Sequence, residues 1–391
     1  MKSFCILLNG SIKNDSRVIK TIHSLSKKYK VDLFYINPSE QDSSNFNKNV
    51  SLFPISNPNG RIKQKILVNA LFYKEFLYLS DAVIHKGKRY DYVWANDLPT
   101  LLPAIKVKEH FKGTQLVYDS HEIYTASISQ LFKLDTGFLK SQIFKVLEKK
   151  MVKLAFEKEK EFIKNVDVFI TVGDALRDYF VEELNYPKAV VIKNCPLLQK
   201  QIKGKDLLRK KFKLKAEDKI FLYQGGIQYG RGLEVVVDAF IETPNNIKLI
   251  IIGGGVLKPK LELIARRAQN KIFFIDTVPY KDLFDYTISA DYGLNYVDNL
   301  NLNTQLACPN KLFEYIQNEL PILMSKNIEN TRLNNKYKIG VCGTIDKKSI
   351  LHTIEQIVTL DLNEFKDNLR IAKNDLNWEE QEKILLQLFQ E

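Results

Sequence analysis

The sequence predicts an α/β protein made of two doubly wound halves. Short apolar runs end in glycine or polar residues, and each is followed by a stretch with helical spacing of apolar residues. This alternation restarts near residue 219. A chain of 391 residues exceeds one ordinary core, and 45% hydrophobic residues can fill two. We therefore expect two parallel sheets with helices on their faces and a cleft between the halves.

The first half opens with the strand pattern KSFCILLNG, a helical stretch and a second strand, VDLFYI. The loop that begins at Asn9 and Gly10 therefore follows the first strand, and open α/β sheets bind ligands at the carboxyl ends of their strands. Arg17 closes this loop, where it could meet an anion or could simply be a solvated helix arginine.

Two later strands of this half end in polar residues. DYVWAND ends at Asn96 and Asp97, and TQLVYDSHEIY ends in a polar cluster formed by Asp119, Ser120, His121 and Glu122. His121 is one of only five histidines and stands next to carboxylates just past a strand. We interpret it as a functional side chain rather than a core histidine.

The formal net charge of +12 favours an anionic partner, namely nucleic acid, an anionic membrane face or a phosphorylated substrate. Segments 61–90 and about 138–164 mix lysines with apolar residues, so each could lie on an anionic membrane. The alternative for each is a core-packing helix with solvated lysines. Nucleic acid fits least, because no recognition motif accompanies the basic residues.

We expect no signal peptide and no membrane-spanning helix, because no apolar run is long enough. The four cysteines lie far apart and form no paired motif, which argues against a zinc site and fits the cytoplasm.

Lysine-rich sequence near 197–210 indicates a boundary between two domains. The predicted divisions are an acceptor-binding domain at 1–200, a donor-binding domain at 201–370 and a C-terminal helix at 371–391 that packs back on the first domain.

In the second half, GGIQYGRG carries the most informative glycines. Gly225 and Gly226 would let the backbone approach a ligand, and Arg231 could bind a phosphate there. The glycines at 253–255, followed about twenty residues later by Asp276, leave a nicotinamide site open as an alternative, although the dinucleotide fingerprint is incomplete.

The stretch QLACPNKLFEYIQNELPILM at 305–324 predicts a loop, a helix and a strand. Asn310 is a possible N-cap, and Glu314 is the one acid among large apolar neighbours near the helix N-terminus. Glu314 could accept hydrogen bonds from a sugar or a ribose. The alternative is an amphipathic helix whose acid only complements the helix dipole.

At this point a family resemblance becomes specific. YQGGIQYGRGLEVVVDAF, IIIGGG, FFIDTVPYKDL, SADYGLNYV and CPNKLFEYIQNELPIL resemble, in order and spacing, the retaining glycosyltransferases of family four, the group-one family with the GT-B fold. VWANDLPTLLPA and LVYDSHEIY resemble the N-terminal half of these enzymes. The likeness covers nearly the whole chain and implies two Rossmann-like domains that face each other across a cleft.

The resemblance implies a nucleotide-sugar donor on the second domain and an acceptor on the first. Arg231 would neutralise the diphosphate, Glu314 would bind the ribose, and backbone at Thr277 and Val278 would meet the base. His121 would approach the transferred sugar. The remaining donor-binding positions implied by the motifs are Asn9, Gly10, Gly225, Gly226, Asn310, Lys311 and Leu312, and Lys311 would also stabilise the leaving group.

Three positions depart from the family pattern. Leu306 stands where a first acid is expected, Gly226 replaces a second basic residue, and Asn318-Glu319 replaces Ala-Gly. Contacts to the sugar hydroxyls therefore cannot be carried over in full.

The resemblance implies transfer with retention to a glycan or lipid-linked acceptor in surface polysaccharide biosynthesis, at the inner membrane face. It implies neither a metal nor another cofactor, and Mg²⁺ is not required by the sequence. Two alternatives remain open: a non-catalytic GT-B-like subunit that binds nucleotide or a partner, and a nucleotide-sugar epimerase.

Overall fold

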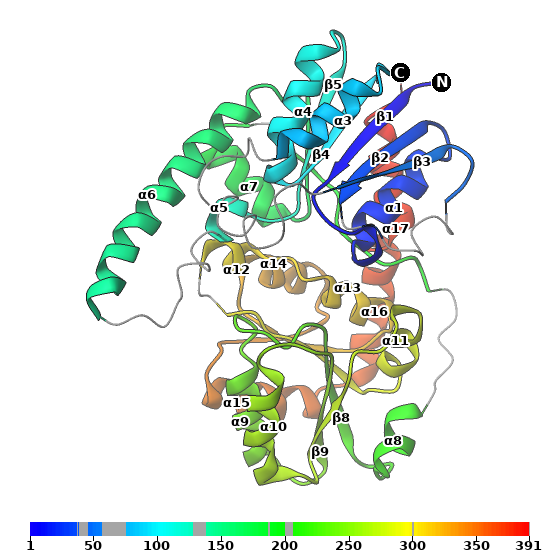
Figure 1. The fold of residues 1–391 in the computed structure, drawn as a ribbon. Helices are drawn as coiled ribbons and strands as arrows, with labels where there is room; N and C mark the ends of the chain where they lie inside the picture. Colours follow the sequence, from blue (N-terminus) through cyan, green and yellow to red (C-terminus); the bar gives the residue numbers. More distant parts are fainter. Residues whose placement is uncertain are drawn as a thin grey trace. The chain divides into compact units, whose positions relative to one another are not determined.

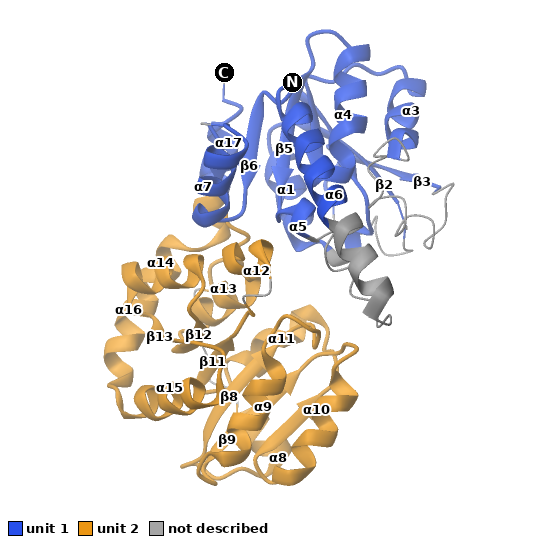
Figure 2. Cartoon of the chain, turned by 90° about the vertical axis from the view of Figure 1, so that its left-hand side faces the viewer, with its two compact units in different colours: residues 1–192, 382–391 blue, residues 193–381 orange. Residues whose placement is uncertain are grey.

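The computed structural model describes residues 1–36, 38, 46–56, 76–127, 138–186, 188–199, 206–298 and 301–390 (Figure 1). The chain divides into two compact units, which Figure 2 colours separately. The N-terminal unit comprises residues 1–192 and 382–391, and the C-terminal unit comprises residues 193–381. The division therefore lies before the boundary at 200/201 that the sequence predicted.

The N-terminal unit contains a seven-stranded parallel sheet in the order β3-β2-β1-β4-β5-β6-β7. Its strands are β1 (Ser3–Leu8), β2 (Lys30–Ile36), β3 (Val50–Ile55), β4 (Tyr92–Asn96), β5 (Gln115–Ser120), β6 (Val168–Thr171) and β7 (Val190–Val191). Its helices are α1 (Ser16–Leu25), α3 (Leu77–His85), α4 (Leu98–His110), α5 (Tyr124–Ser127), α6 (Phe138–Ile163) and α7 (Asp174–Glu183). The central strands are buried on both faces, as parallel strands between helix layers must be.

The C-terminal unit contains a six-stranded parallel sheet in the order β10-β9-β8-β11-β12-β13. Its strands are β8 (Lys219–Gln224), β9 (Ile247–Ile252), β10 (Ile272–Ile275), β11 (Tyr292–Asn295), β12 (Ile322–Ser325) and β13 (Gly340–Gly343). Its helices are α8 (Leu207–Phe212), α9 (Leu233–Glu242), α10 (Lys258–Ala265), α11 (Tyr280–Thr287), α12 (Leu302–Leu306), α13 (Asn310–Gln317), α14 (Ile328–Tyr337), α15 (Lys347–Thr359) and α16 (Leu362–Asp375).

Each sheet has a point where the strand order reverses. This switch point lies between β1 and β4 in the N-terminal unit and between β8 and β11 in the C-terminal unit. Ligands of open α/β sheets bind outside the carboxyl ends of the strands at such points. The loops after β1 and β4, and after β8 and β11, are therefore the first places to search for a site.

The C-terminal tail differs from the predicted single helix at 371–391. That start lies inside α16, which ends at Asp375, and a separate helix, α17 (Trp378–Gln387), follows. The last ten residues belong to the N-terminal unit, where the ring of Phe389 lies 5.0 Å from those of Phe4 and Tyr92. Aromatic packing at this distance ties the chain end to β1 and β4.

The two basic segments are described only in part. Residues 61–75 of the first lie outside the described residues, and its remainder contains α3, whose Leu79 and Val83 are buried. The second forms α6, where Ala155 and Glu159 are buried. The described residues of α3 thus pack into the core. Within the described part of the chain, no helix is long and apolar enough to span a membrane.

Candidate functional site

Two glycine loops meet at the carboxyl ends of β8 and β9. The N–H of Gly225 (φ +123°) donates to the carbonyl of Ile252 at 3.0 Å. A Cβ added to Gly253 (φ +146°) would lie 2.0 Å from the carbonyl oxygen of Gly225. Any side chain at position 253 would therefore separate the two loops, so glycine is required for their close approach.

Lys311 lies beside the loop formed by residues 225–232, called the glycine loop below. Only 9% of its surface is exposed, and its ammonium lies 3.8 Å from the ring centroid of Tyr223. A Cβ on Gly225 would be 3.9 Å from Lys311 Nζ. Among the described residues, Nζ of Lys311 has no hydrogen-bond partner. A buried cation held only by a ring face is poorly compensated.

Arg231 adds a second positive charge to the same place. Burial and the charge of Arg231 hold the pKa of Lys311 well below its usual range, and Glu314 opposes them only in part. Arg231 also faces Tyr223, whose pKa burial raises to about 12. No hydrogen bond or ion pair holds Arg231 within the described part of the chain. Two basic side chains therefore lie at the glycine loop, and the acids that act on them are Asp298, which interacts with Arg231, and Glu314, which interacts with Lys311.

The helix that carries Lys311 begins one residue earlier than predicted, because the sequence analysis took Asn310 as a possible N-cap. Pro309 is the N-cap of α13, no side chain caps this end, and Asn310 is the first helical residue. Asn310 instead accepts a hydrogen bond from Asn194 at 3.1 Å. An uncapped helix N-terminus presents free backbone N–H groups and the positive end of the helix dipole.

Glu314 is held by two polar residues that the sequence analysis missed. Its carboxylate accepts a hydrogen bond from Gln224 at 2.5 Å, and Gln224 accepts one from Thr287 at 2.7 Å. Tyr315 fixes the same strand end, because its hydroxyl donates to the carbonyl of Leu222 at 2.9 Å. The available signal was Gln224 itself, a glutamine that ends an otherwise apolar strand before two glycines.

The other predicted donor-binding positions of this unit lie at the same sheet edge. Thr277 and Val278 follow β10, and a Cβ on Gly254 would lie 3.1 Å from the Thr277 hydroxyl. Gly226 follows Gly225 in the glycine loop. The side chain of Leu312 is fully buried, and its N–H donates to the carbonyl of Pro309 at 3.1 Å.

The structure also describes Leu306, which stands at the position of the expected first acid, and Asp276, on which the nicotinamide alternative depends. Leu306, which replaces the expected acid, is buried at the end of α12. Asp276, the candidate ribose acid of a nicotinamide site, is exposed and forms an ion pair with Lys258. The carboxylate of Asp276 is thus already paired with a lysine.

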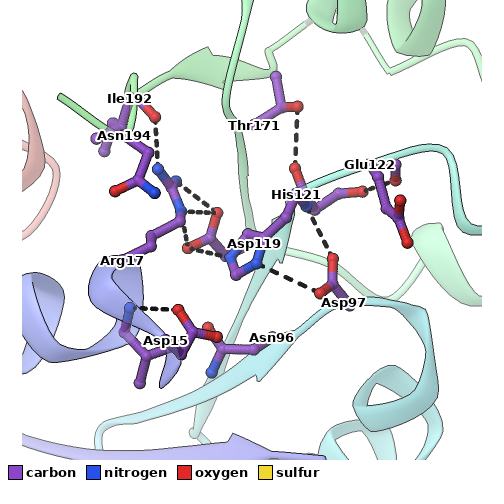
Figure 3. Close-up of polar contacts among 12 residues, drawn as sticks. Asp15, Arg17, Asn96, Asp97, Asp119, His121, Glu122, Thr171, Ile192 and Asn194 are labelled. Atoms are coloured by element: carbon purple, nitrogen blue, oxygen red, sulfur yellow. Dashed lines mark hydrogen bonds and ion pairs between the residues drawn. The ribbon is translucent and has the colours of Figure 1, made fainter. Parts of the chain in front are cut away.

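A second polar cluster lies in the N-terminal unit, around His121 (Figure 3). Nδ1 of His121 lies 3.3 Å from Asp97, and Nε2 lies 3.4 Å from Asp119. The backbone N–H of His121 also donates to Asp97 at 2.8 Å. Burial alone would lower the pKa of His121, but the two carboxylates raise it to about 9. Two carboxylates thus favour the protonated form of His121, although its Nε2 makes no hydrogen bond of good geometry among the described residues.

Asp97 holds its place at some cost in backbone energy. Its φ of 59° with ψ of 166° is a conformation that residues other than glycine rarely adopt, and burial raises its pKa. Such strain costs on the order of 1–3 kcal/mol and concentrates at functional sites. The strain at Asp97 marks this cluster as a candidate site.

The structure corrects both interpretations of Arg17. The side chain is 3% exposed, neither solvated nor free for an anion, because Nη2 lies 2.6 Å and Nε 3.0 Å from the Asp119 carboxylate (Figure 3). Nη1 donates to the carbonyl of Ile192 at 2.6 Å. Burial would raise the pKa of Asp119, but Arg17 and His121 lower it to about 2. Arg17 is thus a structural partner of Asp119.

Asn9 and Gly10 follow β1 at the switch point of the same unit. A Cβ added to Gly10 would meet no atom within 4 Å, so the described residues leave open space there. Among the described residues, no group of three or more His, Cys, Asp or Glu side chains could hold a metal ion.

Residues 204–375 match the family model described as glycosyl transferases group 1. This range covers nearly all of the C-terminal unit, including the glycine loop, Lys311 and Glu314. No curated protein matches the sequence.

Solved structures are similar to the chain over its whole length. Sucrose-phosphate synthase from Thermosynechococcus elongatus has a TM-score of 0.76 at 15% identity, over 100% of this chain and 98% of that one. Anabaena Alr3699/HepE in complex with UDP has a TM-score of 0.73 at 13% identity, over 99% of each chain.

WaaG, a glycosyltransferase involved in lipopolysaccharide biosynthesis, has a TM-score of 0.66 at 16% identity, over 98% of each chain. At such low identities these likenesses show the fold. The structural likenesses show that the chain has the GT-B fold, and residues 204–375 match the family model described as glycosyl transferases group 1.

Proposed function

We propose that this protein transfers a sugar, with retention of anomeric configuration, from a nucleotide-sugar donor to a glycan or lipid-linked acceptor. The observation that carries the proposal is the pair of basic side chains at the glycine loop, where Nζ of Lys311 is buried near Arg231 without a hydrogen-bond partner among the described residues. A diphosphate supplies the charge that this place lacks.

The diphosphate binds between the glycine loop and the N-terminus of α13. Arg231, Lys311 and the free N–H groups of the helix stabilise the charge that grows as the nucleoside diphosphate leaves the anomeric carbon. Gly225 and Gly226 let the backbone approach the phosphates. This role agrees with the match of residues 204–375 to group 1 glycosyl transferases.

The ribose binds to Glu314, and the base lies near Thr277 and Val278. The hydrogen bond from Gln224 orients the Glu314 carboxylate, and the residue is only partly buried. The similar Alr3699/HepE was crystallised in complex with UDP, which supports a uridine nucleotide as the first probe.

The reaction breaks the bond between the anomeric carbon and the phosphate oxygen, and the acceptor oxygen forms its bond on the same face. A phosphate oxygen of the donor takes the acceptor proton, so no protein base is needed. In the N-terminal unit, His121 is assigned to the sugar-binding residues of this proposal together with Asn9 and Gly10, which lie at the same edge of its sheet. Leu306 has no carboxylate to bind the hydroxyls of the donor sugar. The remaining contacts therefore determine which sugar is transferred.

The acceptor binds on the N-terminal unit, and the pathway is surface polysaccharide biosynthesis at an anionic membrane. The net charge of +12 and the exposed lysines of α6, such as Lys149, Lys150 and Lys153, supply the attraction. The similarity to WaaG supports this direction. Co-sedimentation with anionic vesicles, lost at high salt, tests it, whereas equal binding to neutral vesicles would contradict it.

The transferase activity is tested by release of a nucleoside diphosphate from a panel of sugar donors, with and without Mg²⁺. We expect release from at least one donor and its loss in Arg231→Ala and Glu314→Ala. The matched control is Lys347→Ala, which alters a half-buried lysine paired with Asp238 in the same unit. Full activity of both site variants would overturn the site assignment.

A further inference from the structure

The ammonium of Lys311 lies where almost every surrounding feature disfavours a positive charge. It is nine-tenths buried, and no hydrogen-bond acceptor reaches it among the described residues. Lys311 is the second residue of α13, so its backbone lies at the positive end of the helix dipole. A cation in the first turn of a helix is destabilised there.

The charged and titratable groups that face Lys311 come from three elements. Arg231, from the glycine loop, repels the ammonium, and Glu314, from α13 itself, attracts it. Tyr223, from β8, faces it with its ring, and the high pKa of its hydroxyl keeps that group neutral. The Glu314 carboxylate is engaged by Gln224, so it compensates the two cations incompletely.

We propose that the ε-amine of Lys311 is neutral in the free protein and takes up one proton when the diphosphate of a nucleotide binds at the glycine loop. The proton comes from solvent and binds to the amine lone pair, and no covalent bond to the ligand forms. The inference rests on the proposed donor site and specifies how that site acquires its second cation.

The sign of the expected pH dependence of anion affinity follows from linkage between proton binding and anion binding. A diphosphate beside Nζ favours the charged amine, so the pKa of Lys311 rises on binding. Anion affinity must therefore fall as pH increases between the free and bound pKa values, by up to about tenfold per pH unit. An arginine at this position would stay charged throughout and would show no such slope.

The experiment is calorimetric titration of the full chain with UDP and, separately, with inorganic pyrophosphate. Each titration is run at several pH values in two buffers of different ionisation enthalpy, which counts the protons taken up. We expect wild type to take up as much as one proton more per ligand than Lys311→Met or Lys311→Arg. Lys347→Met, altered in a partly exposed ion pair of the same unit, should match wild type.

The outcomes separate the coupling from the donor assignment. Equal proton uptake by wild type and both Lys311 variants would overturn the coupling, while UDP binding would leave the donor site standing. Pyrophosphate binding with the extra proton, but no binding of any nucleoside diphosphate, would support the coupling and overturn the proposed donor. Absence of binding by either probe would overturn both.

Discussion

The two units treat a buried cation near their switch points in opposite ways. In the N-terminal unit, Arg17 is fully engaged by Asp119 and a backbone carbonyl. In the C-terminal unit, Lys311 faces a ring, a second cation and a carboxylate that already has a partner. The first arrangement holds the fold together, whereas the second leaves a basic group whose charged form only an anionic ligand would stabilise.

The comparison therefore distinguishes a structural cation from a binding cation. Removal of one partner from a buried ion pair leaves the other partner uncompensated, which is costly. Removal of a buried charge that has no partner relieves a cost instead. The same substitution should thus change stability in opposite directions in the two units.

The largest effect is expected for Arg17→Met. This change leaves the Asp119 carboxylate buried without its bidentate partner, and we expect a loss of about 3–5 kcal/mol in the free energy of unfolding. Urea unfolding measures it, with Trp94 fluorescence reporting on the N-terminal unit. Arg177→Met is the matched control, because its pairs with Asp174 and Asp178 are partly exposed and contribute about 1 kcal/mol or less. Equal losses in the two variants would contradict the account.

The second effect is a pH dependence caused by His121. Its pKa of about 9 in the folded state lies above the ordinary value of 6.5, so its contribution is fully present below pH 6.5 and is lost as pH rises through 9. We expect a loss on the order of 3 kcal/mol over that window. Unfolding curves at successive pH values should show this slope in wild type and not in His121→Gln. If the free energy of unfolding depends on pH in the same way in wild type and in His121→Gln, His121 does not stabilise the fold through a protonated ring.

The smallest effect is expected for Lys311→Met. This substitution removes a buried amine that has no hydrogen-bond partner among the described residues and keeps an apolar chain of similar length, so the free energy of unfolding should stay within about 1 kcal/mol of wild type or increase. Urea unfolding followed by Trp378, in the C-terminal unit, provides the measurement. A loss as large as that of Arg17→Met would show that Lys311 is structural.

The sequence predicted the fold well because alternating apolar runs and helical spacing are local signals. The strands at the Gly225 and His121 loops were found from such runs, and their parallel pairing is confirmed. The units divide eight residues before the predicted boundary at 200/201, because lysine-rich composition does not reveal which residues pack with which core. The division at 192/193 depends on contacts that only the folded chain shows.

The sequence predicted which residues belong to the candidate site better than it predicted which residues they contact. Arg17 and Asp119 are 102 residues apart in sequence, and nothing local to either residue indicates their ion pair. Gln224 and Thr287 were missed for the same reason, since each acquires its role only through Glu314. Leu312 was assigned by its place in a motif, and its burial could be read only from the helix packing.

The most direct test of the central claim is equilibrium binding of UDP, ADP and GDP to wild type and to Arg231→Met combined with Lys311→Met. The account predicts that at least one nucleoside diphosphate binds wild type and that the double variant binds it at least about a hundredfold more weakly, which is roughly 2.7 kcal/mol. If the double variant binds as tightly as wild type, or if none of the three binds wild type, the glycine loop is not the nucleotide site.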